Sequence, residues 1–261
     1  MKKTTPSFKS PPLIEVSIGI QFKNDLKIKL LEIGEIWSGI DKLKYSECEE
    51  LPPLTSGEVY FDEDLPPSWI CPRYIFKTQD RSQFVQFQKD RFICNWKKEY
   101  GSNEAYPRFK KVRDTFFDNY KKMAAVIKKL RLEAPIPAVL DVNYVNLVEP
   151  PNKTGAGELN SIFRDIGQRE EGRFLPIPRK MSWRQEFDIK DIKAKMTISV
   201  EPLQLAKTGK NMLKYELGVK GPLSEPSLKE MEKWCDEAHF WIVNGFEDLT
   251  TSNMHAAWEK V

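Results

Sequence analysis

Residues 14–23 alternate strictly between apolar and polar side chains, and this pattern constrains the fold more than any other feature of the chain. A period of two predicts a strand with one buried face. The two prolines at 11–12 cannot donate backbone hydrogen bonds, so the strand should begin after them. Such a strand needs a covering layer, and apolar residues at three- and four-residue steps over 30–40 predict a helix. Asn24 or Asp25 is expected to cap that helix.

The next regular pattern is a hairpin with its turn at Lys89 and Asp90. Folding the chain there places Phe87 opposite Phe92 and separates apolar from polar side chains on two faces. Between the first helix and this hairpin, the acidic and proline-bearing residues 42–68 are predicted to form an irregular surface loop.

Residues 108–131 carry the strongest helical pattern, and Pro107 suits a first helical position. A strand over 140–148 follows, with apolar residues on both faces, which predicts an interior position in a sheet. The first half therefore has the order β-α-β-β-α-β, which is typical of a ferredoxin-like sheet.

Turn-forming residues at 150–157 predict a boundary between two lobes, 1–150 and 151–261. Three alternating segments, 183–187, 196–200 and 213–219, predict a three-stranded antiparallel meander. A long C-terminal helix should then begin after Ser227, with Glu230 at the capping-box position. The predicted fold class is α+β, with a ferredoxin-like first lobe and a second lobe of antiparallel sheet plus helix.

Composition restricts the classes of function. Basic and acidic residues nearly balance, with a net charge of +3, so no field of the whole molecule would attract nucleic acid or anionic lipid. No signal-like or membrane-length apolar run occurs, and we expect a cytoplasmic protein that does not enter a membrane. The four cysteines lack metal-binding spacings and are expected to be free thiols. Metal sites, cofactors and catalytic signatures are not predicted, and this favours a protein that is not an enzyme.

Two local features carry alternative functions. His239 and His255 lie in the C-terminal helical region, and Asp236 could orient His239 for base chemistry in a hydrolase or nuclease. Residues 108–131 hold a local excess of basic side chains, which could contact the phosphates of a nucleic acid unless the acidic residues 47–64 cover them. The lysines that would do so are Lys110, Lys111, Lys121, Lys122, Lys128 and Lys129.

Polar residues also recur where a core would not require them. Asn95, Asn143 and Asn146 are expected to lie at neighbouring points of the first lobe. Core packing alone does not account for them, because buried amides need hydrogen-bonding partners. They either bond the loop at 97–106 to the sheet or line a pocket. If Arg91 or Arg108 is buried, it would need a carboxylate such as Glu15 or Asp141, and such a network could fix the fold without binding anything.

At these residues the chain resembles a sporadically distributed prokaryotic family of uncharacterised proteins. The resemblance rests on an opening Pro-Pro strand, an Arg-Phe-x-x-Asn-Trp stretch, a Tyr-Pro-Arg-Phe stretch, a Tyr-x-Asn strand, a His-x-x-Ile-x-x-x-Phe helix and a His-x-x-Trp tail. It marks the candidate binding or structural residues Glu15, Arg91, Asn95, Trp96, Tyr106, Arg108, Tyr144, Asn146, His239, His255 and Trp258. Its patchy distribution implies an accessory role, in phage defence or a toxin–antitoxin-like module.

The leading hypothesis from sequence is therefore a non-enzymatic protein whose partner is another protein. The nucleic-acid-binding helix is the first alternative, and chemistry at His239 or His255 is the second.

Overall fold

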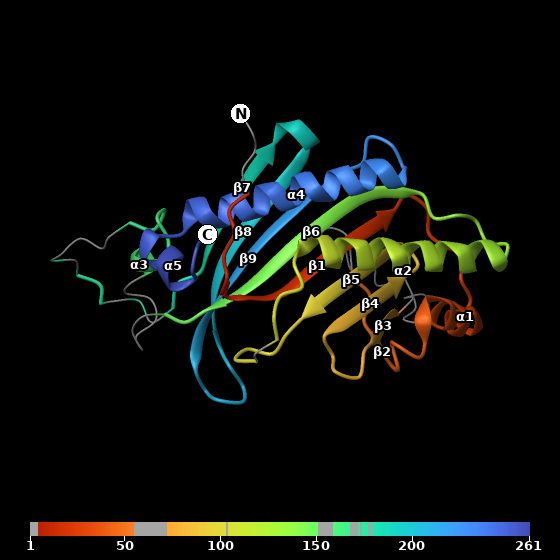
Figure 1. Ribbon diagram of the computed structural model, residues 1–261, viewed down its shortest axis with the longest axis horizontal. Coiled ribbons are helices and arrows are strands. Elements are labelled where there is room, and N and C mark those ends of the chain that lie inside the picture. Colours follow the sequence, from red (N-terminus) through yellow and green to blue (C-terminus); the bar gives the residue numbers. More distant parts are fainter. Residues whose placement is uncertain are drawn as a thin grey trace.

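One antiparallel sheet of nine strands organises the molecule, in the order β2-β3-β4-β5-β1-β6-β9-β8-β7 (Figure 1). This computed structural model describes residues 5–54, 72–102, 104–150, 159–167, 172, 174–176, 178 and 180–261. The strands are β1 (Leu13–Phe22), β2 (Glu47–Leu51), β3 (Arg73–Lys77), β4 (Gln83–Gln88), β5 (Arg91–Lys97), β6 (Pro137–Val148), β7 (Trp183–Ile189), β8 (Ala194–Gln204) and β9 (Asn211–Pro222). The helices are α1 (Leu30–Asp41), α2 (Phe109–Lys129), α3 (Leu159–Ile162), α4 (Leu228–Leu249) and α5 (Ser252–Ala257), with a short 3-10 turn at Lys190–Ile192.

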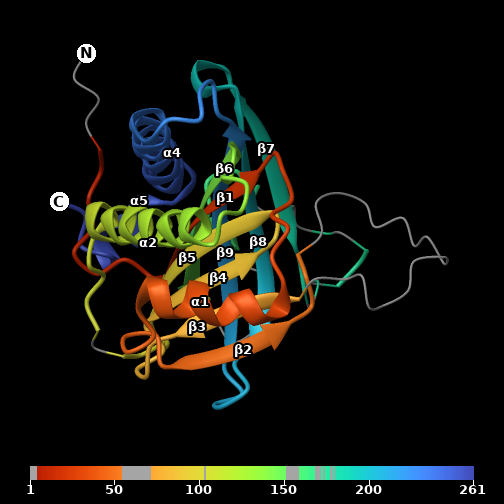
Figure 2. The same cartoon turned by 90° about the vertical axis from the view of Figure 1, so that its right-hand side faces the viewer.

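The strand predicted from the alternating residues 14–23, β1, lies near the middle of this sheet. Ile18 of β1 pairs with Cys94 of β5 on one side and with Val142 of β6 on the other. All three side chains are buried on the same face. The helices α1, α2 and α4 cover that face (Figure 2). The opposite face carries mostly polar side chains.

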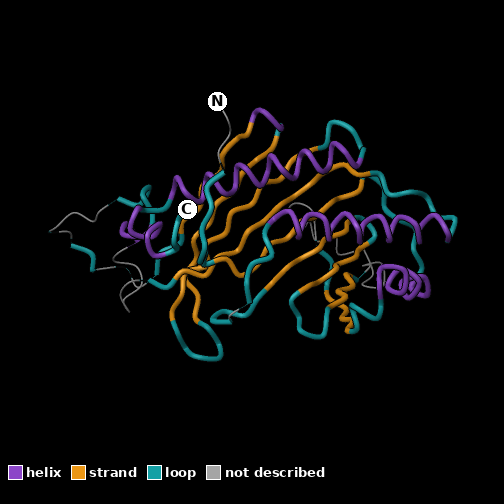
Figure 3. The backbone as a smooth tube through the Cα atoms, viewed as in Figure 1, coloured by secondary structure: helices purple, strands orange, loops and turns teal. Residues whose placement is uncertain are grey.

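The two long helices cross the same face of the strands (Figure 3). Their buried residues repeat at three- and four-residue steps, which is the pattern that the sequence predicts for each. The shorter α1 packs on α2, where a Cβ at Gly39 would collide with the side chain of Val126. Trp37 of α1 also stacks on Phe76 of β3, with 5.6 Å between ring centroids. The helix α1, held against α2, thus covers the part of the sheet formed by β3.

A similar order of elements occurs twice along the chain, with four strands between the helices in the first run and three in the second. The first run is β1-α1-β2-β3-β4-β5-α2, and the second is β6-α3-β7-β8-β9-α4. In each run the first strand pairs with the strand that precedes the long helix, and β1 pairs with β6 at the junction of the two runs. The region between α2 and α4 therefore lies where the two runs meet.

The α+β class is confirmed, and so are the interior position of β6 and the pairing of Phe87 with Phe92. The ferredoxin-like arrangement is not confirmed, because β2 and β3 lie between α1 and β4 and the sheet continues past β6. The three predicted meander strands pair as expected, but they belong to the larger sheet. The predicted lobe boundary falls largely at residues 151–158, outside the described residues, and stays a prediction.

Three local predictions are wrong. Residues 47–51 form the edge strand β2 instead of a loop, held by pairing with β3 although the segment lacks the alternation of buried and exposed residues. Asn24 bonds the backbone of Ala134 and Ile136 instead of capping α1, whose N-cap is Lys29. Pro107 lies outside α2, which has Arg108 as its N-cap.

None of the described helices combines the length and the apolar composition needed to cross a membrane. Cys48, Cys94 and Cys235 are free thiols, and Cys71 lies outside the described residues.

Candidate functional site

A cavity of about 600 Å³ lies under the junction of the two long helices. Its floor comes from β1, β6 and β9, its walls from the start of α2 and the middle of α4, and its remaining side from the amino-terminal residues 5–11. Most of the lining is apolar and aromatic. Ligand pockets of proteins share this size range and this mixture of apolar walls with few polar groups. The apolar lining includes Phe8, Leu13, Phe109, Leu217, Ile242, Val243 and Phe246.

Three predicted site residues form a hydrogen-bonded chain in this cavity. The hydroxyl of Tyr144 lies 3.1 Å from the hydroxyl of Tyr106 and 2.9 Å from Nδ1 of His239. Phe109 stacks on the imidazole at 4.2 Å between ring centroids, with the rings nearly parallel. Tyr144 comes from β6 and His239 from α4, so the chain joins the floor of the cavity to its wall.

The imidazole of His239 is neutral near pH 7, because burial and the nearby Arg113 cation lower its pKa to about 4. Burial also raises the pKa of Tyr106 and of Tyr144, so both phenols keep their protons. The Nε2 atom of His239 makes no hydrogen bond to any described residue. A neutral histidine can place its proton on either nitrogen, and the neighbouring hydroxyl decides which nitrogen accepts.

Arg108 lies at the mouth of the cavity with an unusual backbone conformation. Its φ of 71° and ψ of 151° fall in a region that residues other than glycine rarely occupy. The guanidinium is exposed, and Nη1 donates a hydrogen bond to the carbonyl oxygen of Phe8 at 3.2 Å. The carboxylate predicted for a buried Arg108 is therefore not needed.

Asp236 does not orient His239, contrary to the sequence-based alternative. Both of its carboxylate oxygens accept from Nη1 of Arg113, at 2.5 and 2.6 Å. Arg113 also donates to Asp114 at 3.2 Å and is mostly buried. The carboxylate therefore balances an arginine of α2 and links α2 to α4 beside the cavity.

The amino-terminal wall of the cavity is fixed by the end of the chain. Ser7 and Lys9 exchange backbone hydrogen bonds with Val261 and Glu259. The ring of Phe8 is buried and lies 5.8 Å from the ring of His255 and 6.4 Å from that of Trp258. The His-x-x-Trp tail thus forms a socket for Phe8.

His255 has a structural environment. Its Nε2 atom lies 2.9 Å from Thr250 Oγ1 and 3.1 Å from the Glu247 carbonyl oxygen, at the end of α4. The side chain is 8% exposed, and burial lowers its pKa. These contacts close the turn between α4 and α5, and His255 does not line the cavity.

Asn146 does not lie beside the other two asparagines, contrary to the expectation, whereas Asn95 and Asn143 flank Ser17 of β1 on one face. Asn146 lines the cavity and donates from Nδ2 to the Tyr215 carbonyl oxygen at 3.1 Å. Asn95 lies on the opposite face of the sheet, where Nδ2 donates to Glu15 Oε1 and Oδ1 accepts from Gln86, each at 2.7 Å. Asn143 donates to Glu216 on that face as well. Side chains alternate between the two faces along a strand, and Asn143 and Asn146 of β6 are three positions apart, so their amides lie on opposite faces.

Trp96 contacts the loop at 97–106, and none of the three asparagines bonds to its described residues. The Nε1 atom of Trp96 donates to Glu104 Oε1 at 3.3 Å, and its ring packs on Tyr106 at 5.2 Å between centroids. Trp96 thus positions the loop that leads into Tyr106 and Arg108 at the cavity mouth.

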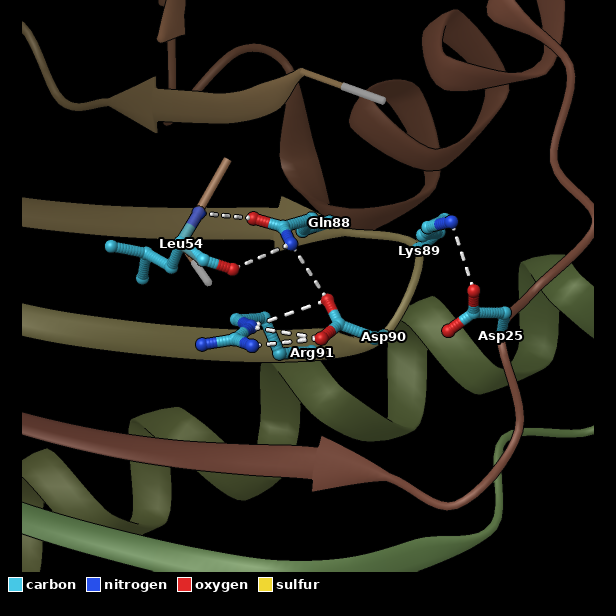
Figure 4. A network of polar contacts seen from close by, with 6 residues as sticks. All are labelled: Asp25, Leu54, Gln88, Lys89, Asp90 and Arg91. Carbon is cyan, nitrogen blue, oxygen red and sulfur yellow. Dashed lines mark hydrogen bonds and ion pairs between the residues drawn. The ribbon is translucent and has the colours of Figure 1, made fainter. Parts of the chain in front are cut away.

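Arg91 takes part in a network at the β4–β5 turn and not in the cavity (Figure 4). Its guanidinium pairs with Asp90 at 2.8 Å, and Asp90 also accepts from Gln88. Gln88 in turn exchanges hydrogen bonds with the backbone of Leu54. The carboxylate that forms an ion pair with Arg91 is the adjacent Asp90. The charge of Arg91 also acts on the predicted Asp141, where it opposes the rise in pKa that burial causes. The network ties the segment after β2 to the turn.

The basic face of α2 is partly neutralised. Lys110 pairs with Asp114 at 2.7 Å and Lys129 pairs with Glu35 at 3.6 Å, both in exposed positions. Of the acidic residues 47–64, Glu47 and Glu49 of β2 pair with Arg81 and Lys77 and not with the lysines of α2. Residues 55–64 lie outside the described residues, so their cover of the helix stays a prediction. Lys121, Lys122 and Lys128 are also exposed and form no ion pair with a described residue, and the exposed Lys111 lines a smaller cavity beside α2.

Sequence reasoning missed Phe8 and Arg113. Phe8 is an isolated aromatic residue in a polar stretch, and no periodicity marks it. Arg113 belongs to the basic side of α2, where it is indistinguishable from the lysines until α4 is placed beside it. Among the described residues, no group of three acidic, histidine or cysteine side chains has the arrangement of a metal site.

No family model matches the chain, and no curated protein matches it. Among solved structures, the crystal structure of DynU16, a protein in the dynemicin biosynthetic locus, matches with 9% sequence identity and a TM-score of 0.25. The match covers 90% of this chain and 97% of that chain. A likeness at this level carries no inference about ligand or activity. The resemblance to the sporadically distributed family stays a prediction.

Proposed function

We propose that this protein is a non-enzymatic binding protein whose ligand is a largely apolar small molecule held in the cavity between α2 and α4. The observation that carries the proposal is the cavity itself, about 600 Å³ in volume, with the Tyr106–Tyr144–His239 chain set into an otherwise apolar lining. Apolar walls supply affinity by the hydrophobic effect, and a few fixed polar groups supply orientation.

The polar chain suits binding more than catalysis. Nδ1 of His239 is engaged by Tyr144, and the cavity lining includes no cysteine. Neither Ser7 nor Thr5, the lining residues with aliphatic hydroxyls, forms a hydrogen bond with the imidazole among the described contacts. Covalent catalysis usually needs a nucleophile hydrogen-bonded to its base. Among the described residues, His239 has no such serine, threonine or cysteine nucleophile beside it, so the geometry does not support a hydrolase.

A protein partner, a role in phage defence or a toxin–antitoxin-like module, and a cytoplasmic location remain proposals. They are supported by the resemblance and by the sequence. Nucleic-acid binding by α2 also remains a proposal, supported by the exposed Lys121, Lys122 and Lys128.

The test of cavity binding uses a neutral apolar dye, N-phenyl-naphthylamine, whose fluorescence rises in apolar surroundings. We expect saturable binding with one dye per chain. Val243→Trp should abolish it, because the larger ring fills the cavity from α4. Lys229→Trp adds the same ring at an exposed position of α4 and serves as the matched control. Dye binding that is absent, or equal in all three proteins, would contradict the proposal.

A further inference from the structure

The charged side chains around the cavity are mostly cations. Arg108, Lys110 and Arg113 line it, against a single lining carboxylate, Asp236. Arg113 is already balanced by Asp236 and Asp114, and Lys110 pairs with Asp114. Arg108 bonds only the neutral carbonyl of Phe8 and has no carboxylate partner among the described residues. Its charge is therefore the one left for a ligand.

The amino-terminal end of α2 adds to the positive charge of Arg108 at the cavity mouth. Its N-cap makes no side-chain hydrogen bond, and its first turn holds no acidic residue. In contrast, α4 has the Ser227 hydroxyl on the Glu230 amide and an acid in its first turn. Unsatisfied amides and the helix dipole favour an anion at such an end.

The backbone of Arg108 is held in an unfavourable conformation at this point. A residue other than glycine persists there only when the surroundings enforce it, and such strain is concentrated at functional sites. Glycine would suit the position without strain. An arginine retained at this φ, beside the cavity, supports a role for the guanidinium at the cavity mouth.

Resting on the proposed function of the cavity, we propose that the ligand is an anionic amphiphile. Its carboxylate pairs with Arg108 at the mouth, and its apolar body lies in the cavity against Phe109, Ile242 and Phe246. A guanidinium and a carboxylate form charge-assisted hydrogen bonds, which are stronger than neutral ones. The apolar lining behind the cation selects a chain or ring system and disfavours a fully hydrated anion.

The experiment compares dodecanoate with dodecanol, which share one apolar chain and differ in head group. Each is titrated against the dye bound to the full-length protein at low ionic strength. We expect dodecanoate to displace the dye at least about tenfold more effectively than dodecanol. Raising the salt concentration should reduce the difference, because the arginine is exposed.

Two variants test the residue. Arg108→Gln should reduce dodecanoate binding about tenfold and leave dodecanol binding unchanged. Arg108→Gly should do the same without backbone strain, and unchanged dodecanol binding in both variants would show that the cavity itself is intact. Lys229→Gln removes an exposed cation at the far end of α4 and should change neither ligand.

The outcomes separate this inference from the proposed function. Equal displacement of the dye by dodecanoate and dodecanol from the natural protein, with dye binding lost in Val243→Trp, would leave the proposed binding cavity standing and overturn the anionic head group. A dodecanoate preference that survives both Arg108 substitutions would overturn the role of Arg108. Failure of the dye itself to bind would remove the proposed function, and this inference with it.

Discussion

The hydroxyl of Tyr144 lies 2.9 Å from Nδ1 of His239, and the same hydroxyl lies 3.1 Å from that of Tyr106. A hydroxyl has one proton to donate, so the chain can run in either of two directions. When Tyr144 donates to His239, Nε2 carries the imidazole proton. When His239 donates from Nδ1, Nε2 becomes an acceptor and Tyr106 is free to donate. The chain can therefore meet a ligand donor or acceptor without moving a side chain.

His239 should make the protein less stable in mild acid. Its pKa is 6.5 in the unfolded chain and about 4 when folded, so between these pH values the unfolded state binds more protons. Its contribution is complete above pH 6.5 and is lost as the pH falls towards 4. A shift of this size corresponds to on the order of 3 kcal/mol. Urea unfolding across this range measures the free energy of unfolding.

The matched variant for this experiment is His239→Asn, whose amide can still bond Tyr144 but does not titrate. His255 and the carboxylates remain in both proteins, so their contributions cancel in the difference. We expect the free energy of unfolding of the natural protein, relative to the variant, to rise from pH 4 to pH 6.5. A flat difference would mean that His239 titrates normally in the folded state.

Tyr144→Phe should destabilise the protein through the partners that it leaves behind. The substitution keeps the ring and removes only the oxygen, so Nδ1 of His239 loses its partner in a mostly buried place. An unsatisfied buried polar group costs about 1–3 kcal/mol. A double-mutant cycle with Tyr106→Phe measures the coupling, which we expect to be at least about 0.5 kcal/mol. Strictly additive effects would show that the two hydroxyls do not interact.

Arg108→Gly should be more stable than Arg108→Ala. Both remove the guanidinium and its bond to Phe8, but alanine keeps the strained φ of 71°. Such strain costs about 1–3 kcal/mol, which exceeds the extra entropy of glycine in the unfolded chain, about 0.4–1 kcal/mol. Thermal or urea unfolding of the pair measures the difference. If alanine is as stable as glycine, the backbone there is not strained.

Much of the framework follows from local periodicity in the sequence. The alternation of β1, the hairpin register at Lys89 and the helical patterns of α2 and α4 are repeated over enough residues to exclude other structures. The edge strand β2 escaped prediction because pairing with β3 forms it, and its acidic residues would suit a loop equally well. The joining of all nine strands depends on the contact of β1 with β6, which is distant in sequence.

The candidate site was only partly within reach of the sequence. Motif residues Tyr106, Tyr144 and His239 do meet, although three separate elements carry them. The alternation of side chains along a strand could have separated Asn95 from Asn146. Asn95 shares a face with Glu15. Tyr144 pairs with Val16 on the other face, and Asn146, two positions further along β6, lies on that face with Tyr144. The wall formed by Phe8 could not be predicted, because backbone bonds to the end of the chain hold it.

Asn95→Ala should separate structural from binding roles among the motif residues. The substitution leaves the amide of Gln86 and the carboxylate of Glu15 without a shared partner in a mostly buried position. We expect a loss of about 1–3 kcal/mol in the free energy of unfolding.

Dye binding by Asn95→Ala should nevertheless be unchanged, because this residue lies on the face of the sheet opposite the cavity. The control is Val243→Trp, for which we expect the reverse: loss of dye binding from a site beside α4. Measuring unfolding by urea and binding by dye fluorescence on the same preparations gives both readouts. A parallel loss of stability and binding in Asn95→Ala would show that the two faces of the sheet are coupled and that the cavity does not act alone.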